Sequence, residues 1–171
     1  MAVPERVRWA VETLDPGPDE RLLEIGCGPG VAVAAVCERL AGGRLVAVDR
    51  SATAIARATR RNQAQVDAGR AVLRTVALED LRPADVLTDG RRFDKVFAMN
   101  VNLFWVRSPA RELALVRELL DPAGALYLFY GYGGDGPAPR VPGALDGHLA
   151  AAGFGVEHRS GAATVCVVAT P

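Results

Sequence analysis

The feature that most constrains the fold of this chain is a glycine-rich turn between an apolar run and an alanine-rich segment. The apolar run ends at Ile25, and glycine then stands at every second position, at Gly26, Gly28 and Gly30. Glycine lets the backbone turn tightly, and its missing Cβ lets a ligand lie against the main chain. Three alternating glycines exceed what a plain turn needs. The sequence therefore predicts a ligand-binding loop between a strand and a helix.

Short apolar runs alternate with longer helical patterns along the chain, which is typical of a parallel α/β sheet. Strands are expected at residues 21–25, 44–49, 71–77, 93–100, 125–130, 156–160 and 163–169. Helices are expected at residues 4–14, 31–40, 83–88, 109–120 and 141–152, and from the N-cap Ser51 to about Asp67. Because only Gly161-Ala162 joins the last two strands, they must be antiparallel neighbours. We expect a parallel sheet with one antiparallel strand at its end.

Composition narrows the class of protein. The length of 171 residues fits one domain, and 20 basic and 20 acidic residues give a formal net charge of zero. A nucleic-acid partner would require a basic face, so none is expected. Three cysteines without a CxxC pair describe neither a zinc site nor a disulfide framework. The charged N-terminal segment does not resemble a signal peptide, and no apolar run approaches ~20 residues, so we expect a cytoplasmic protein without a membrane partner.

The spacing of the glycines separates two kinds of nucleotide-binding loop. The dinucleotide fingerprint needs a glycine at its sixth position. Val31 stands there when counting starts at Gly26, and Val33 when it starts at Gly28. Both registers fail, which argues against a nicotinamide-dependent oxidoreductase.

The loop instead resembles motif I of class I S-adenosylmethionine-dependent methyltransferases, an acidic residue followed by Gly-x-Gly-x-Gly. Glu24, Gly26, Gly28 and Gly30 match this pattern, and Cys27 lies within it. The resemblance implies that the loop holds the amino-acid end of the cofactor, whose ammonium group suits an acidic side chain. It also implies a Rossmann-like three-layer sandwich over residues 1–171, with a seven-stranded, mostly parallel sheet and a reversed C-terminal hairpin. The helix and linker of residues 1–18 would cover the cofactor side.

Further cofactor contacts follow from the same resemblance. Asp49 ends the second strand about twenty residues after the glycine loop, where an acidic side chain accepts hydrogen bonds from ribose hydroxyls. The family pattern then places Arg50 beside the adenine. Asn100 ends the fourth strand and is expected to face the cofactor.

The adenine wall is expected at Ala77, Leu78 and Glu79. Many family members carry an aspartate that binds the adenine amino group at the position of Ala77, so this chain departs from the pattern. Either the alignment differs here, or Glu79 or a water takes over that contact.

No motif in the sequence identifies the methyl acceptor. Asn102, Trp105, Tyr130 and Tyr132 follow the fourth and fifth strands, at the edge where ligands bind in open α/β sheets. They are the candidate acceptor-binding residues, and we hypothesise that one of the tyrosines orients the acceptor. No metal site and no catalytic residue is identified, and neither of the two histidines lies in a motif.

The sequence thus predicts methyl transfer from S-adenosylmethionine to a small-molecule acceptor, leaving S-adenosylhomocysteine. Since the sulfonium already activates the methyl group, a dedicated base is optional. Two alternatives stay open: a non-catalytic or regulatory S-adenosylmethionine-binding protein, and an NAD(P)-binding oxidoreductase. The acceptor site would be open, completed by residues 4–14, or completed by the second subunit of a homodimer.

Overall fold

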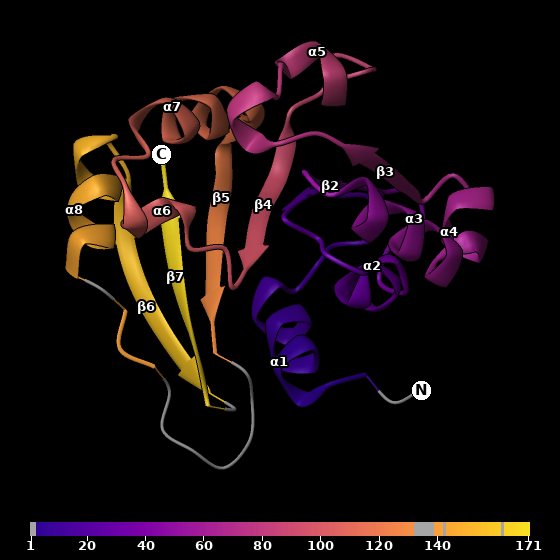
Figure 1. The fold of residues 1–171 in the computed structure, drawn as a ribbon, viewed down its shortest axis with the longest axis horizontal. Helices are drawn as coiled ribbons and strands as arrows, with labels where there is room; N and C mark the ends of the chain where they lie inside the picture. The colour runs from indigo at the N-terminus through magenta and orange to yellow at the C-terminus, as the bar shows by residue number, and fades with distance from the viewer. Residues whose placement is uncertain (1–2, 132–138, 142, 162) are drawn as a thin grey trace.

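The structure, a computed structural model, describes residues 3–131, 139–141, 143–161 and 163–171, and it is built on one seven-stranded sheet (Figure 1). The strands are β1 Arg21–Ile25, β2 Arg44–Asp49, β3 Ala71–Thr75, β4 Phe93–Met99, β5 Leu120–Tyr130, β6 Gly155–Gly161 and β7 Thr164–Thr170. Their order is β3-β2-β1-β4-β5-β7-β6. This confirms the expected Rossmann-like fold with a seven-stranded, mostly parallel sheet.

The reversed strand lies inside the sheet. β7 is antiparallel to both β5 and β6, and its neighbours place it one position in from the edge. The expected position at the very end of the sheet is therefore wrong by one strand. The hairpin explains the difference, because β7 turns back into the space between β6 and β5, and its residues from Thr164 to Ala169 are buried there.

Helices cover both faces of the sheet. They are α1 Glu5–Leu14, α2 Val31–Cys37, α3 Ala52–Arg61, α4 Gln63–Asp67, α5 Pro83–Val86, α6 Leu103–Val106, α7 Ala110–Leu119 and α8 Gly143–Ala151, with a single turn of 3₁₀ helix, η1, at Leu78–Asp80. One core cluster joins α1 and α2 to one face, and a second joins α7 and α8 to the other. The interior strand β1 is buried along its whole length, as a parallel strand covered on both faces must be.

The helix expected from Ser51 to Asp67 is broken at Asn62. Ser51 does cap the helix, since its hydroxyl accepts a hydrogen bond from the Ala54 N–H at 3.2 Å. Asn62, however, is buried, and its side-chain amide donates to the carbonyl oxygens of Gly30 at 2.9 Å and Ala58 at 2.8 Å. These bonds hold Asn62 outside helical geometry, so α3 ends before it and α4 begins after it.

Several other expected boundaries move by a few residues. α2 ends at Cys37 because hydrogen bonds between residues three apart tighten its last turn. β5 begins at Leu120, directly after α7, because a β-bulge in the β4–β5 pairing takes up the segment containing Asp121 and Pro122. Neither η1 nor α6 was expected. No helix in the described part of the chain is long and apolar enough to cross a membrane.

Candidate functional site

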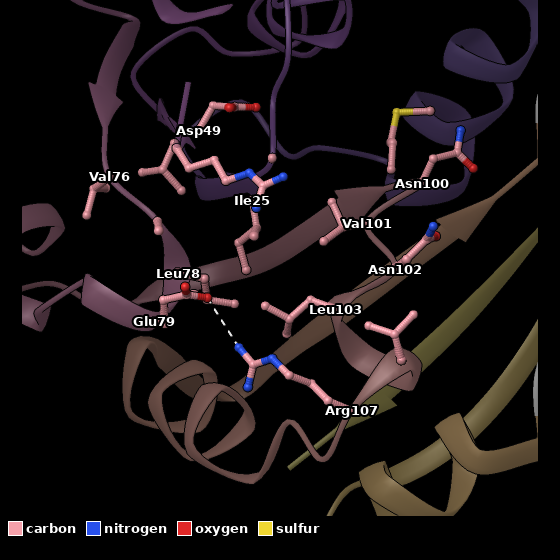
Figure 2. A pocket seen from close by; sticks show the side chains of 16 residues that line it. Ile25, Asp49, Val76, Leu78, Glu79, Asn100, Val101, Asn102, Leu103 and Arg107 are labelled. Carbon is pink, nitrogen blue, oxygen red and sulfur yellow. Dashed lines mark hydrogen bonds and ion pairs between the residues drawn. The ribbon is translucent and has the colours of Figure 1, made fainter. Parts of the chain in front are cut away.

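A pocket of about 570 Å³ opens at the carboxyl ends of β1, β2 and β4, with η1 and α6 forming its other walls (Figure 2). The sheet order explains its position. The chain builds β1, β2 and β3 outward in one direction and then crosses back to place β4 on the other side of β1. Such a reversal leaves a crevice at the strand ends. The lining residues are Ile25, Gly26, Val48, Asp49, Arg50, Val76, Ala77, Leu78, Glu79, Met99, Asn100, Val101, Asn102, Leu103, Val106 and Arg107.

The glycine loop forms one end of this pocket, and its glycines have different structural roles. Gly26 lines the pocket at a φ of +71°, and a Cβ there would lie 2.6 Å from a methyl carbon of Val101. Gly30 caps α2 at a φ of +72° and faces α3, where a Cβ would lie 2.7 Å from the Cβ of Ala58. Gly26 therefore shapes the pocket, while Gly30 permits close packing behind it.

Asp49 connects the glycine loop to the end of β2. Its Oδ2 accepts a hydrogen bond from the Gly28 N–H and its Oδ1 accepts one from the Ser51 N–H, both at 2.8 Å. Each carboxylate oxygen can accept a second bond, and Asp49 lines the pocket. The carboxylate is thus held in place, with capacity left for a ligand that carries hydroxyl groups.

Glu24 lies at the end of β1 next to the glycine loop and is 3% exposed. Within the described residues, its Oε2 has no hydrogen-bond partner. Burial, followed by the nearby Asp49 carboxylate, raises the pKa of Glu24 to about 8. A buried carboxyl group without a partner is costly, and a cation supplied by a ligand would offset that cost. Glu24 itself is not part of the pocket lining.

Asn100 lies at the opposite side of the pocket from Glu79 in Figure 2. It adopts a left-handed backbone with a φ of +55°, which asparagine tolerates better than most residues. Its side-chain amide donates to the Gly131 carbonyl at 2.9 Å and accepts from the Gly131 N–H at 3.0 Å. The side chain therefore extends the pairing of β4 and β5 beyond the end of β4.

Eight of the sequence-predicted site residues line the pocket: Gly26, Asp49, Arg50, Ala77, Leu78, Glu79, Asn100 and Asn102. Cys27 and Gly28, like Glu24 and Gly30, lie outside the lining. The buried Cys27 thiol contacts the Gly28 carbonyl at 3.7 Å, and burial raises its pKa. None of residues 3–18 lines the pocket, so α1 supports the sheet rather than this wall.

The two aromatic candidates that the structure describes lie behind the pocket wall. Trp105 and Tyr130 pack edge to face, with ring centroids 4.1 Å apart. The Tyr130 hydroxyl donates to the Val101 carbonyl at 3.3 Å, and burial raises the pKa of its phenol. Neither residue belongs to the lining, so this placement does not support their expected contact with an acceptor. Tyr132 lies outside the described residues.

The sequence interpretation missed the wall formed by α6 and its C-cap. Leu103, Val106 and Arg107 line the pocket, and Val106 is 66% exposed. Arg107 forms ion pairs with Glu79 at 3.2 Å and with the buried Glu112 at 2.6 Å. The one available signal was an apolar residue, Val106, next to the charged Arg107, which is a weak signal in a sequence.

The strand order and the pocket at the strand ends are those of a Rossmann-like domain. Residues 22–124 match the sequence model of a family described as a methyltransferase domain. The chain belongs to that family. This confirms the predicted membership of the class I S-adenosylmethionine-dependent methyltransferases.

Individual proteins are also similar to this chain. An uncharacterised 37.1 kDa protein in transposon TN4556 of Streptomyces fradiae is 31% identical over 121 residues, which are 69% of this chain and 32% of that protein. The chain thus spans about a third of the curated relative it matches. A SAM-dependent methyltransferase from Aquifex aeolicus superposes with a TM-score of 0.74 at 12% identity, covering 98% of this chain and 89% of that one. The [4+2]-cyclase SpnF superposes with a TM-score of 0.73 at 16% identity, covering 96% and 79%.

Proposed function

We propose that this chain binds S-adenosylmethionine in the pocket and catalyses transfer of its methyl group to a small-molecule acceptor. The observation that carries the proposal is the pairing of two carboxyl groups beside the glycine loop. Asp49 is held by backbone N–H groups with lone pairs to spare, and Glu24 is buried without a partner for Oε2. The cofactor supplies what each one lacks, hydroxyl groups for Asp49 and an ammonium group for Glu24.

The residues present fit this cofactor along its length. Asp49 would accept hydrogen bonds from the ribose hydroxyls, and Gly26 would let the amino-acid end lie against the backbone. The apolar side chains of Leu78, Leu103 and Val106 would cover the adenine ring. Val106 is 66% exposed, so a bound adenine ring would remove apolar surface of this side chain from water.

When bound, S-adenosylmethionine supplies a methyl group that its sulfonium has already activated. The protein must hold the two reactants in line and exclude water. Asn100 serves this purpose, because the Gly131 hydrogen bonds fix its backbone at the end of β4. The titratable side chains among the described lining residues are Asp49, Arg50, Glu79 and Arg107, and the proposal assigns none of them as a base.

A small molecule is the favoured class of acceptor. The formal net charge of zero does not favour a polyanion, and a pocket of about 570 Å³ is within the range of small-molecule sites. Asn102 is the polar lining residue next to Asn100 and is the candidate for contact with the acceptor.

Titration calorimetry with S-adenosylmethionine and S-adenosylhomocysteine tests the binding step. Asp49→Asn should weaken S-adenosylhomocysteine binding about 10- to 100-fold, because it removes a charge-assisted acceptor of the ribose hydroxyls. Asp67→Asn, an exposed change on α4, is the matched control and should leave the affinity unchanged.

The two alternative functions, an NAD(P)-binding oxidoreductase and a regulatory cofactor-binding protein, predict different results in binding and activity assays. Binding of NAD(P) without binding of either methyl-cofactor form would contradict the proposal. Methylation can be screened over many candidate acceptors by mass spectrometry. Tight binding of S-adenosylmethionine without methylation of any acceptor would favour a regulatory cofactor-binding protein.

A further inference from the structure

The edge strand β6 has a neighbouring strand on one side only, within the described residues. It pairs with β7 through all seven of its residues without a bulge, and Figure 1 shows it at the outer side of the sheet. An edge strand carries a row of backbone N–H and C=O groups that can pair with another strand. Proteins commonly protect such an edge with proline, lysine, a bulge or a very short strand. β6 has none of these features.

One face of β6 carries a symmetrical pattern of side chains. Every second residue of a strand points to the same face, and on this face the residues are Gly155, Glu157, Arg159 and Gly161. Glu157 and Arg159 form an exposed ion pair at 2.9 Å. A Cβ on Gly161 would clash with the indole nitrogen of Trp9. An acid and a base therefore stand between two residues that have no side chain.

This pattern is complementary to itself in one register. Two antiparallel copies of β6 can shift against each other only by two residues at a time, because outward N–H groups alternate along a strand. With a two-fold axis at His158, Glu157 lies opposite Arg159 of the second copy. Gly155 then lies opposite Gly161. An axis at Glu157 or at Arg159 would place that residue opposite its own copy, and like charges directly opposite each other are destabilising.

The helix beside this edge supplies a second observation. Asp146 on α8 contacts the His158 ring at 3.0 Å, so α8 lies next to the middle of β6. A surface helix normally turns charged or polar side chains toward water. The exposed residues of α8 are instead glycines and alanines only, namely Gly143, Ala144, Gly147, Ala150 and Ala151. The absence of charge on the outer side of this helix favours contact with another chain.

We propose that β6 pairs with β6 of a second copy of this chain, antiparallel about His158, so that the two seven-stranded sheets join into one. Two reciprocal ion pairs between Glu157 and Arg159 fix the register. The same surface serves both copies, as in a two-fold symmetric dimer. The outward backbone groups of β6 gain hydrogen bonds, and α8 of each copy flanks the joint. The pocket at β1, β2 and β4 lies away from this edge.

Sedimentation equilibrium over a range of protein concentrations tests the dimer. The wild-type chain should reach twice the mass of one chain. Glu157→Arg should weaken the association about tenfold or more, because an arginine then lies opposite Arg159 at both ends of the contact. Arg159→Glu should have the same effect. The double variant, Glu157→Arg with Arg159→Glu, restores opposite charges in the same register, so its affinity should return to within about threefold of the wild type.

A matched control and a second measurement locate the interface. Glu38→Arg reverses an exposed acidic residue just past α2, which packs on β2 far from β6, and should keep the wild-type affinity. Hydrogen exchange followed by mass spectrometry should show protection of the β6 amides that increases with protein concentration. A wild-type monomer at every concentration, or a dimer that neither single reversal weakens, would overturn the proposal. A double variant as weak as the single variants would also overturn it, since Glu157 and Arg159 would then not meet across the interface.

Discussion

At the scale of single residues, the site depends on carboxyl groups placed in three different environments. Asp49 is held by two backbone N–H groups, Glu79 is held by Arg107, and Glu24 is buried beside the glycine loop. The sequence could place Glu24 and Asp49, because each lies at the end of a predicted strand at a spacing tied to the glycine loop. It could not show that Oε2 of Glu24 has no partner, since that depends on how the loop and β2 close over it.

The burial of Glu24 predicts a pH-dependent stability. Because its pKa is raised to about 8 in the folded chain, the native state keeps a proton that the unfolded state releases above about pH 4.5. The free energy of unfolding should therefore fall as pH rises from about 4.5 to 8, by at most about 1.4 kcal/mol per pH unit from this group. Glu24→Gln removes this dependence, so its stability relative to wild type should grow between pH 5 and pH 8.

Urea denaturation of both chains at pH 5 and pH 8, without cofactor, measures this effect. Glu38→Gln changes an exposed carboxyl group just past α2 and is the matched control, for which the difference from wild type should stay nearly constant. A constant difference for Glu24→Gln as well would show that Glu24 is ionised in the folded chain, contrary to this account.

At the scale of elements, the strands were easier to predict than the breaks between helices. Continuous apolar runs such as residues 45–48 favour a strand that is buried on both faces of a parallel sheet. The break at Asn62 and the short helix α6 have no such local cause. Asn62 leaves the helix because Gly30, distant in sequence, offers it a carbonyl group, and α6 forms because Phe104 enters the core. Arg107 was missed for the same reason, since α6 carries it to the pocket.

Asn62 should therefore contribute to stability out of proportion to its position at a helix end. Asn62→Ala removes two buried hydrogen bonds and leaves the Gly30 carbonyl without that donor. We expect the free energy of unfolding to fall by about 2 kcal/mol, measured by chemical denaturation. The neighbouring, exposed Gln63→Ala should cost less than about 0.5 kcal/mol. Equal effects of the two substitutions would contradict the role given to Asn62.

At the scale of the whole molecule, the sheet order brings the site together. β1 and β2 lie side by side and β4 joins on the far side of β1, so Gly26, Asp49 and Asn100 lie at the carboxyl ends of three adjacent strands. The sequence predicted these three residues from the family pattern, and the structure places all of them in one pocket. Of the residues expected on the acceptor side, Asn102 lines the pocket, whereas the rings of Trp105 and Tyr130 pack against each other and lie outside the lining.

A crystal structure of this chain with S-adenosylhomocysteine would show directly whether the pocket holds the cofactor. We expect the ribose hydroxyls within hydrogen-bond distance of Asp49, the ammonium group beside the glycine loop and Glu24, and the adenine between η1 and α6. A ligand bound elsewhere, or bound in this pocket with its adenine at the glycine loop, would contradict the proposed cofactor site.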